Sequence, residues 1–437
     1  MKLLHCLPLG ESMLPEFIHR LQEVGKNGCA GRMALVLPSP YLLEQARTRL
    51  RLTDVAAWEF PRILSLDELA AYLAGVRKIS RLEQEFLIDG IVKETMAAGR
   101  FPYFGRIADF PGFITALARL FDEFKMAAVT PVELVEAIEA LQDEVEWNEE
   151  RDAAICALFA AYQEKLADLS RVDLGGMYEA AIEKLAQRDR RLPFDRIFLA
   201  EFSVLSPVRL ELIQCLKNRD EVELEIGICF EKNRPGVFRS VEPVYDALVG
   251  MGFQAEFHPV ASIPSPALTH LRRELFADQP ALGDTADGIR ILSCPNRARE
   301  LCVVADQIKA LLQEREIDPR SVAVVTQDPA AYSRLRAVFA ERGIPVDRAD
   351  AVPMLERSLP RLVFDWLALV RERGSRAAFF AVLKSPYVAQ RLDWDGDELE
   401  WSLLDEVLRN WEDWPTSEGW RGKWQELRLR VQEWERA

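Results

Sequence analysis

The sequence lacks long apolar segments. In its 437 residues no apolar run approaches the roughly 20 residues that a membrane-spanning helix needs. The first residues, MKLLHCLPLG, hold only a short apolar stretch, which a proline and Glu11 interrupt. That pattern does not predict a signal peptide, because the apolar region is too short and no cleavage site follows it. No membrane partner is expected, and the cytoplasm is the expected compartment.

The usual spacings of metal-binding cysteine and histidine are also missing. None of the seven cysteines forms a CxxC, and the four histidines add no zinc-type spacing. The cysteines are expected to be buried, reduced thiols. The histidines, His5, His19, His258 and His270, are dispersed, and the sequence suggests no partner that would make a catalytic dyad. The sequence therefore predicts neither a metal site nor a disulfide framework.

The sequence has fewer positive than negative side chains, 55 lysines and arginines against 70 aspartates and glutamates, which gives a formal net charge of −15. Taken alone, this argues against non-specific binding to nucleic acid, which needs lysine and arginine to displace phosphate counterions. A local basic track remains compatible with a negative total. Two groups of arginines are either such tracks or solvated faces: Arg47, Arg49 and Arg51, and Arg188, Arg190, Arg191 and Arg196.

Strand and helix patterns alternate in the first part of the chain. Residues 33–37 (MALVL) form a short apolar run closed by prolines, which is typical of a buried parallel strand. Apolar residues then recur at helical spacing over residues 41–52, and a second short strand is predicted around residues 56–60. Ser65 is the expected N-cap of the next helix, with Glu68 completing a capping box.

A helical region separates two parts of this first α/β pattern. Residues 80–169 carry apolar stripes at helical spacing in four successive segments. The strand pattern resumes at residues 196–202 and 221–230, with a helix between them. The sequence therefore predicts a first parallel-sheet domain made of residues 1–79 and 170–284, interrupted by a helical insertion.

A second strand and helix alternation follows a predicted domain boundary near Asp284. The expected strands are residues 288–294, 321–327 and 344–348. Two helical patterns lie between them, so a second parallel sheet is predicted over residues 285–359. Residues 360–437 are predicted to form another helical insertion.

Six segments in a fixed order carry a family resemblance. They are LPSPYLLEQARTRL, FITALARLFDEFKMAAVTPVEL, RIFLAEFSVLSPVRLELIQCLKN, CPNRARELCVVADQIKALL, SVAVVTQDPAAYSRLRAVFAERGIPVDR and FFAVLKSPYV. Together they resemble the AddB/RexB-type component of the ATP-dependent helicase/deoxyribonuclease family over about residues 30 to 390. The resemblance implies an α/β fold of two RecA-like (P-loop NTPase-like) parallel-sheet domains with helical insertions.

The ATP site of that fold is degenerate in this sequence. Such a site needs GxxxxGK[ST], whose amides, lysine and hydroxyl hold the phosphates and Mg²⁺. The loop after the first strand reads PLGESMLPEF, with Gly10 but without the lysine. At the strand end where the family holds Mg²⁺, Glu201 follows Ala200, and Gln327 stands where active relatives carry arginine. The resemblance therefore implies no nucleotide site and no catalytic residue.

The nuclease part of the family is not recognisable either. Relatives end in a PD-(D/E)xK metal-dependent nuclease domain with cysteines for an iron–sulfur cluster, whereas the last cysteine here is Cys302. The chain itself is therefore expected to need no cofactor. We expect that the natural protein continues beyond Ala437 as an exonuclease subunit, and that any Mg²⁺ or iron–sulfur cluster belongs to that further domain.

Five residues are candidates for contact with DNA. Tyr41, Gln45 and Arg49 lie on the helix after the first buried strand end, where the family contacts single strands, and Arg297 and Arg299 open the second α/β pattern. Tyr41 could instead pack on a proline, and the arginines could cap a helix or face solvent. The tryptophan-rich segment is residues 394–434, which hold seven of the ten tryptophans. It either stacks on bases or packs a helical bundle.

The expected function is that of a non-catalytic, helicase-like part of a DNA helicase–nuclease subunit. It would bind or channel DNA during double-strand-break end processing and recombinational repair, with DNA ends and an A-type helicase–nuclease subunit as partners. The alternative is a protein-interaction scaffold without DNA contact, which the charge of −15 and the tryptophan-rich segment favour.

Overall fold

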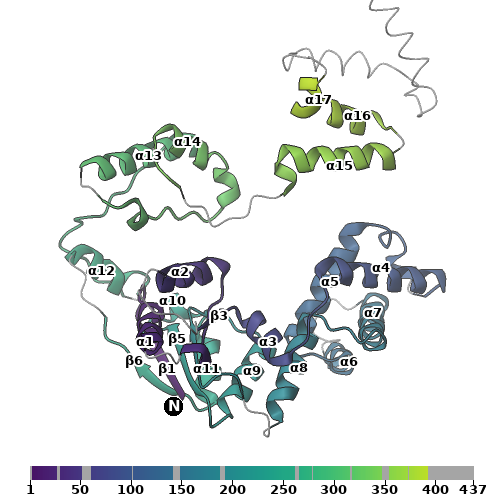
Figure 1. Ribbon diagram of the computed structural model, residues 1–437, viewed down its shortest axis with the longest axis horizontal. Coiled ribbons are helices and arrows are strands. Elements are labelled where there is room, and N and C mark those ends of the chain that lie inside the picture. The colour runs from purple at the N-terminus through teal and green to yellow at the C-terminus, as the bar shows by residue number, and fades with distance from the viewer. Residues whose placement is uncertain are drawn as a thin grey trace, which may run out of the picture. The chain divides into compact units, whose positions relative to one another are not determined.

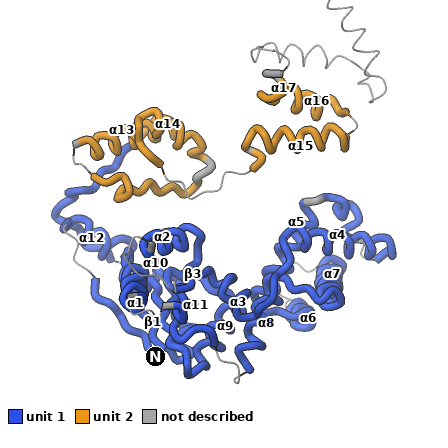
Figure 2. Tube along the Cα trace, in the orientation of Figure 1, with its two compact units in different colours: residues 1–292 blue, residues 293–437 orange. Residues whose placement is uncertain are grey.

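The computed structural model describes residues 2–26, 30–51, 61–100, 102–140, 148–187, 192–260, 265–277, 279–314, 317–346, 354–372 and 374–391. The chain divides into two compact units, residues 1–292 and residues 293–437 (Figure 2). The predicted strand around residues 56–60, the arginines at 188, 190 and 191 and the tryptophan-rich segment lie outside the described residues. None of the described helices is long and apolar enough to cross a membrane.

A six-stranded parallel sheet forms the centre of the first unit (Figure 1). Its order is β3-β2-β4-β5-β1-β6, and every neighbouring pair runs parallel. The strands are β1 (Lys2–Leu7), β2 (Met33–Val36), β3 (Arg62–Leu64), β4 (Arg196–Ala200), β5 (Glu223–Cys229) and β6 (Gln254–Phe257). The first parallel sheet predicted from the sequence is thereby confirmed.

Helices cover both faces of this sheet. On one face, α1 (Leu14–Lys26) and α2 (Pro40–Arg51) pack on a core in which Phe17 stacks on Phe198 with ring centroids 4.6 Å apart. The opposite face, with Leu4 and Ile226, belongs to a second core. The helices that contribute to this second core are α3 (Leu66–Ala74), α8 (Leu174–Ala186), α9 (Pro207–Lys217), α10 (Pro235–Phe238) and α11 (Glu242–Gly250). Burial on both faces explains why β2 and β4 read as continuous apolar runs.

A helical insertion with its own core lies between α3 and α8. Its helices are α4 (Arg81–Ala97), α5 (Pro111–Met126), α6 (Pro131–Ala140) and α7 (Glu149–Asp168), which confirms the helical pattern of residues 80–169 in the described part (Figure 1). Phe121 stacks on Tyr162 inside this core, with centroids 5.4 Å apart. The predicted capping box at the start of α3 is also present, with Ser65 and Glu68 bonding each other's backbone.

The insertion joins the sheet through a buried charge, the Lys125 cluster. Lys125 on α5 lies 3.4 Å from Asp173, the N-cap of α8, and 3.3 Å from Glu179 on α8. It also donates a hydrogen bond to Gln163 on α7 at 3.1 Å. Gly175 permits this approach, because a Cβ there would lie 2.5 Å from Lys125 Cβ.

The second unit is helical in the described residues. Its helices are α13 (Arg297–Glu314), α14 (Leu335–Glu341), α15 (Ser358–Arg371), α16 (Arg376–Leu383) and α17 (Pro386–Arg391). The α13 and α14 helices share a small core that includes Ile308 and Phe339. The second RecA-like sheet is not evident, and the strands predicted in the described parts of residues 288–294, 321–327 and 344–348 are wrong.

The physical reason is that no strand pairs with these apolar segments among the described residues. A strand is defined by its pairing, and an apolar sequence alone cannot supply a partner. Ile291 is 95% exposed and Val325 is 90% exposed, so neither lies in a described core. Several elements of the first unit were not predicted from the sequence. Among them are the edge strand β6, whose residues read as polar, and the helix α12 (Pro266–Glu274).

The described cysteines are free thiols, as predicted. Cys6 and Cys156 are buried, and burial raises the pKa of Cys6 to about 12. Cys215, Cys229, Cys294 and Cys302 are only half-buried. The prediction of free thiols is confirmed for the described residues, and full burial is confirmed for two of them.

Candidate functional site

The strand order marks one place where a ligand is expected. The connection from β1 leads past β5 and β4 to β2, whereas the connection from β5 leads past β1 to β6. The carboxyl ends of β1 and β5 therefore flank the point at which the chain changes direction across the sheet. Open α/β sheets bind ligands at such switch points. Residues 8–13, between β1 and α1, occupy this position and form the β1–α1 loop.

Hydrogen bonds within the β1–α1 loop, and one to Glu201, fix its conformation. Gly10 has φ of +79°, a conformation that favours glycine, and Glu11 donates its N–H to the Pro8 carbonyl at 3.0 Å. Ser12 accepts from the Leu14 N–H at 3.0 Å and donates its hydroxyl to Glu201. A helix N-terminus binds an anion through its free N–H groups. Ser12 already caps one of those groups here.

Three carboxylates line this loop. Glu231 accepts from the Leu9 N–H at 2.8 Å, Glu11 forms an ion pair with Arg272, and Glu201 contacts Ser12. Glu201 has φ of +67°, which is uncommon for a residue with a side chain. Burial raises the pKa of the neighbouring Cys229, and the charges of Glu201 and Glu231 add to this rise. The loop therefore lies in an acidic environment.

The nearby cations already have partners. Arg272 on α12 donates to the Leu9 carbonyl as well as to Glu11. Arg234 is buried, lies 3.3 Å from Glu231, and donates to the Arg272 carbonyl at 2.8 Å. A triphosphate placed here would meet three carboxylates, without a lysine to balance its charge.

A side chain also fills the space beneath the loop. A Cβ added to Gly227 on β5 would lie 2.7 Å from Met13 Cβ and 2.9 Å from its Cγ. Met13 therefore packs directly on the sheet backbone at the switch point. Both this packing and the acidic lining are unfavourable for a nucleotide phosphate.

The other two predicted nucleotide positions, Glu201 and Gln327, belong to different units, and Glu201 contacts Ser12 of the loop. Ala200 is buried at the end of β4, next to Glu201. Gln327 belongs to the second unit, where it is exposed and lines a hollow of about 330 Å³ between α13 and the segment 324–328. The position of Gln327 relative to Glu201 stays a prediction.

The predicted DNA contacts fall into two groups. Tyr41, Gln45 and Arg49 lie along the outer side of α2, just after the carboxyl end of β2, where Gln45 donates a hydrogen bond to the Tyr41 hydroxyl. Tyr41 is half exposed and Arg49 is exposed, so Tyr41 is not a core residue.

In the second unit, Arg297 lines the same hollow as Gln327. Arg299 is exposed in the first turn of α13, and its N–H donates to the side chain of Asn296 at 2.9 Å. The structure therefore brings Arg297 near Gln327. All five DNA contacts stay predictions.

Sequence comparison gives the family. Residues 69–263 match the family model described as ADDB, N-terminal. This chain belongs to the AddB family. It is 26% identical to a protein of Desulforamulus reducens that is named as the B-type subunit of an ATP-dependent helicase/deoxyribonuclease. The match covers 71% of this chain and 28% of that protein.

Other relatives carry the same name. The protein of Acetivibrio thermocellus is 27% identical over 66% of this chain and 26% of its own length. That of Clostridium kluyveri is 21% identical over 94% of this chain and 37% of its own length. The AddB-family chain thus spans between about a quarter and two fifths of the relatives that it matches.

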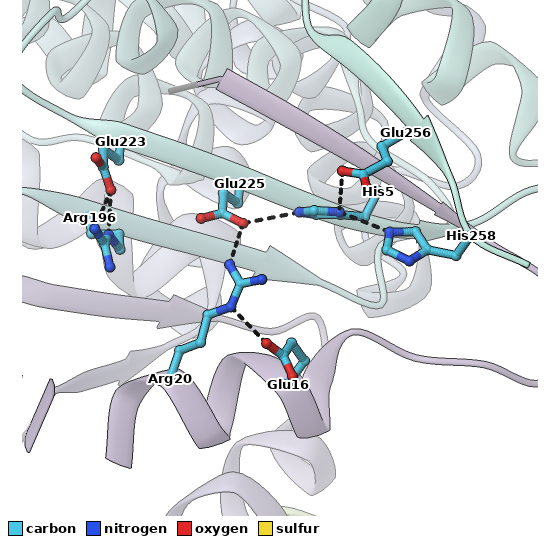
Figure 3. Close-up of polar contacts among 8 residues, drawn as sticks. All are labelled: His5, Glu16, Arg20, Arg196, Glu223, Glu225, Glu256 and His258. Carbon is cyan, nitrogen blue, oxygen red and sulfur yellow. Dashed lines mark hydrogen bonds and ion pairs between the residues drawn. The ribbon is translucent and has the colours of Figure 1, made fainter. Parts of the chain in front are cut away.

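One group of polar residues in this AddB-family chain was missed from the sequence. His5 Nδ1 lies 3.0 Å from His258 Nε2, a pairing that the sequence did not suggest (Figure 3). His5 Nε2 lies 3.0 Å from Glu225. Burial raises the pKa of Glu225, but its bonds to His5 and Arg20 lower that pKa more, for a net decrease. The two histidines are 253 positions apart, and only the pairing of β1 with β6 brings them together.

Proposed function

We propose that the chain is the helicase-like, catalytically silent part of a DNA helicase–nuclease subunit, and that it binds or channels DNA during double-strand-break end processing and recombinational repair. The observation that carries the proposal is the closed, acid-lined β1–α1 loop in a member of the AddB family. In an active RecA-like domain the corresponding loop cradles phosphates with backbone amides and a lysine. Here carboxylates and Met13 occupy that place.

The topology supports a RecA-like origin for the first sheet. The strand β1 lies between β5 and β6, and its loop leads directly into α1. This is the strand–loop–helix arrangement in which P-loop proteins hold nucleotide phosphates. The proposal is therefore that the fold was kept while the reaction was lost, with ATP hydrolysis left to an A-type partner.

The surface of α2 is the proposed DNA contact. Tyr41 offers an exposed ring for stacking on a base, and Arg49 offers an exposed cation for the backbone phosphates. Tyr41 lies in the first turn of α2, just after the carboxyl end of β2, where α/β sheets bind ligands, and Arg49 lies in the last turn of the same helix. The net charge of −15 makes such a local contact dependent on low or moderate salt.

A nucleotide assay tests the silent site. We expect no phosphate release from ATP above background, with or without single-stranded DNA, and no saturable binding of a fluorescent ATP analogue. DNA-stimulated turnover by the purified chain, lost on adding a non-hydrolysable analogue, would show an active ATPase and refute the proposal.

A DNA-binding series tests the contact. Fluorescence anisotropy with a labelled single strand would be measured across a range of salt from about 20 to about 300 mM. We expect binding that weakens with salt, and an affinity about ten-fold lower in Tyr41→Ala, since stacking contributes about 1–3 kcal/mol per base. Arg49→Glu should also reduce affinity. The matched control is Arg320→Glu, because Arg320 is exposed in the second unit. Binding that neither α2 variant alters places the contact elsewhere.

A protein-interaction scaffold is the second candidate, and α15 favours it. Several apolar residues of this helix are exposed among the described residues: Val363, Phe364, Trp366, Leu367 and Val370. Exposed apolar patches of this kind mark interaction surfaces. Capture of the chain by an A-type helicase–nuclease protein, compared with and without DNA, separates the candidates. Capture that does not depend on DNA, together with no DNA binding by the chain alone, favours the scaffold.

A further inference from the structure

Three metal-ligating side chains meet at the edge of the sheet. His5 lies on the inner strand β1, while Glu256 lies on the edge strand β6 and His258 directly follows that strand. His5 Nδ1 is 3.0 Å from His258 Nε2 and 3.8 Å from a Glu256 carboxylate oxygen, and the three ligand atoms all lie within 4.8 Å of one another (Figure 3).

Backbone pairing fixes this convergence. Cys6 pairs with Phe257 in the parallel register of β1 and β6, and the His258 N–H donates to the Cys6 carbonyl at 3.0 Å. The side chains are therefore brought together by the strand register and not by a flexible loop.

A second layer of bonds orients the inner histidine. Glu225 on β5 lies 3.0 Å from His5 Nε2 and is buried together with it. Arg20 on α1 donates to the same Glu225 oxygen at 2.8 Å and to Glu16 at 2.9 Å. A hydrogen bond between His5 Nε2 and this carboxylate occupies that ring nitrogen. The other ring nitrogen, His5 Nδ1, lies on the side of His258 and Glu256.

We propose that His5, His258 and Glu256 bind one zinc-like divalent transition-metal ion. Two imidazoles and one carboxylate are a donor set that suits Zn²⁺, whereas Mg²⁺ and Ca²⁺ prefer oxygen ligands. Zinc bonds of about 2.0–2.1 Å in a tetrahedron place ligand atoms roughly 3.3 Å apart. The observed separations of 3.0 and 3.8 Å lie on either side of that value.

The surroundings match a metal site in two further respects. A metal-bound histidine commonly donates its other ring N–H to a carboxylate, and His5 Nε2 lies 3.0 Å from the Glu225 carboxylate. The Glu256 side chain is 60% exposed and His258 is half-buried, so an ion can enter from solvent and a water can be the fourth ligand.

The ion would tie a weak strand to the centre of the sheet. All four residues of β6 are exposed, and one of its sides has no neighbouring strand among the described residues. Binding at His258 and Glu256 would hold the end of β6 against β1. This role does not depend on the proposed function, since it involves neither DNA nor nucleotide.

Zinc titration of the chelator-treated, full-length chain tests the site. Calorimetry should show one site of micromolar or tighter affinity, with Zn²⁺ raising Tm. His258→Ala should weaken binding at least about 100-fold and abolish the Tm shift, while Glu256→Gln should weaken it about ten-fold, and Glu225→Gln about 10–100-fold through the loss of orientation. These surface changes leave the packed core in place, except for Glu225→Gln, whose fold is checked by circular dichroism.

His19→Ala is the matched control, because His19 is an exposed histidine that faces a glutamate at 3.9 Å on one helix. It should leave the affinity and the Tm shift unchanged. The Co²⁺ form should show the visible absorption of a four-coordinate site in the wild type and not in His258→Ala. The proposal is overturned if the wild type shows no saturable binding, or if His258→Ala and Glu256→Gln bind as tightly as the wild type.

Discussion

Two clusters of buried charge in the first unit differ in what surrounds them. We call the group of His5, Arg20, Glu225, Glu256 and His258 the sheet cluster. In the Lys125 cluster a buried cation faces carboxylates on α8, inside the joint between the insertion and the sheet. The sheet cluster instead leaves an imidazole nitrogen aimed at a half-open edge.

Lys125 is a charge that stabilises the fold, whereas His5 lies beside groups that could bind a ligand with it. Lys125 is already compensated, so it needs nothing from solvent and its role is to hold two helical parts together. His5 is oriented by Glu225 on one side and has further metal-ligating groups on the other. Burial alone therefore does not mark a functional charge. What distinguishes His5 is the pair of potential metal ligands beside its Nδ1.

The largest expected effect comes from removing the Lys125 charge. Lys125→Met keeps much of the volume but leaves Asp173, whose side chain is 3% exposed, as an uncompensated buried carboxylate. Breaking a buried pair from one side costs about 3–5 kcal/mol. Urea unfolding followed by circular dichroism should show this loss. Lys93→Met is the control, since Lys93 pairs with Asp89 on an exposed helix surface, and it should cost less than about 1 kcal/mol. Equal losses in both variants would contradict the structural role of Lys125.

The next effect concerns the carboxylate of the sheet cluster. Glu225→Gln, measured with chelator present, removes charge-assisted bonds to His5 and Arg20 and should cost about 1.5–3 kcal/mol. Glu223→Gln is the control on the same strand. Glu223 pairs with the half-exposed Arg196, so its replacement should cost at most about 1 kcal/mol (Figure 3). If Glu225→Gln cost less unfolding free energy than Glu223→Gln, the buried charge of the sheet cluster would not stabilise the fold as Lys125 is expected to do.

A steric change tests the fit of the Lys125 cluster. Gly175→Ala places a Cβ 2.5 Å from Lys125 Cβ, so α5 and α8 must move apart. Overpacking of this kind costs about 1–3 kcal/mol. Gly90→Ala in α4 is the control, because an added Cβ there meets nothing within 4 Å, and it should stabilise the chain by about 0.5–1 kcal/mol. If urea unfolding showed that Gly175→Ala also stabilises the chain, the close approach of Lys125 to α8 would not require a glycine at this position.

The sequence predicts local features better than distant pairings. The Ser65 and Glu68 capping box and the apolar strands β2 and β4 were predicted because their signals lie within a few residues. The edge strand β6 was missed, since its exposed residues give no apolar run, and with it the partner of His5. The opposite error occurred at Val325, where an apolar run predicted a strand that lacks a neighbour in the described residues.

The same limit applies to the β1–α1 loop. The absence of a P-loop lysine was readable from PLGESMLPEF. The contact of Met13 with Gly227 and the bonds from Arg272 on α12 were not, because they join segments more than about 200 positions apart. Composition and periodicity carry no information on which side chain fills a switch point. The strand order locates the switch point, and the folded structure shows that Met13 fills it.

The smallest expected effect makes the sharpest test of the comparison. Lys125 has two carboxylates at nearly equal distance, Glu179 at 3.3 Å and Asp173 at 3.4 Å, but the Glu179 side chain is 55% exposed. Solvent screens the exposed pair, so in urea unfolding Glu179→Gln should cost less than about 1 kcal/mol, and its effect should shrink further in about 0.5 M salt. Asp173→Asn, by contrast, should cost several-fold more and respond little to salt. Should the two variants cost the same, distance and not burial would set the strength of these pairs. The distinction between Glu225 and Glu256 in the sheet cluster would then lose its physical basis as well.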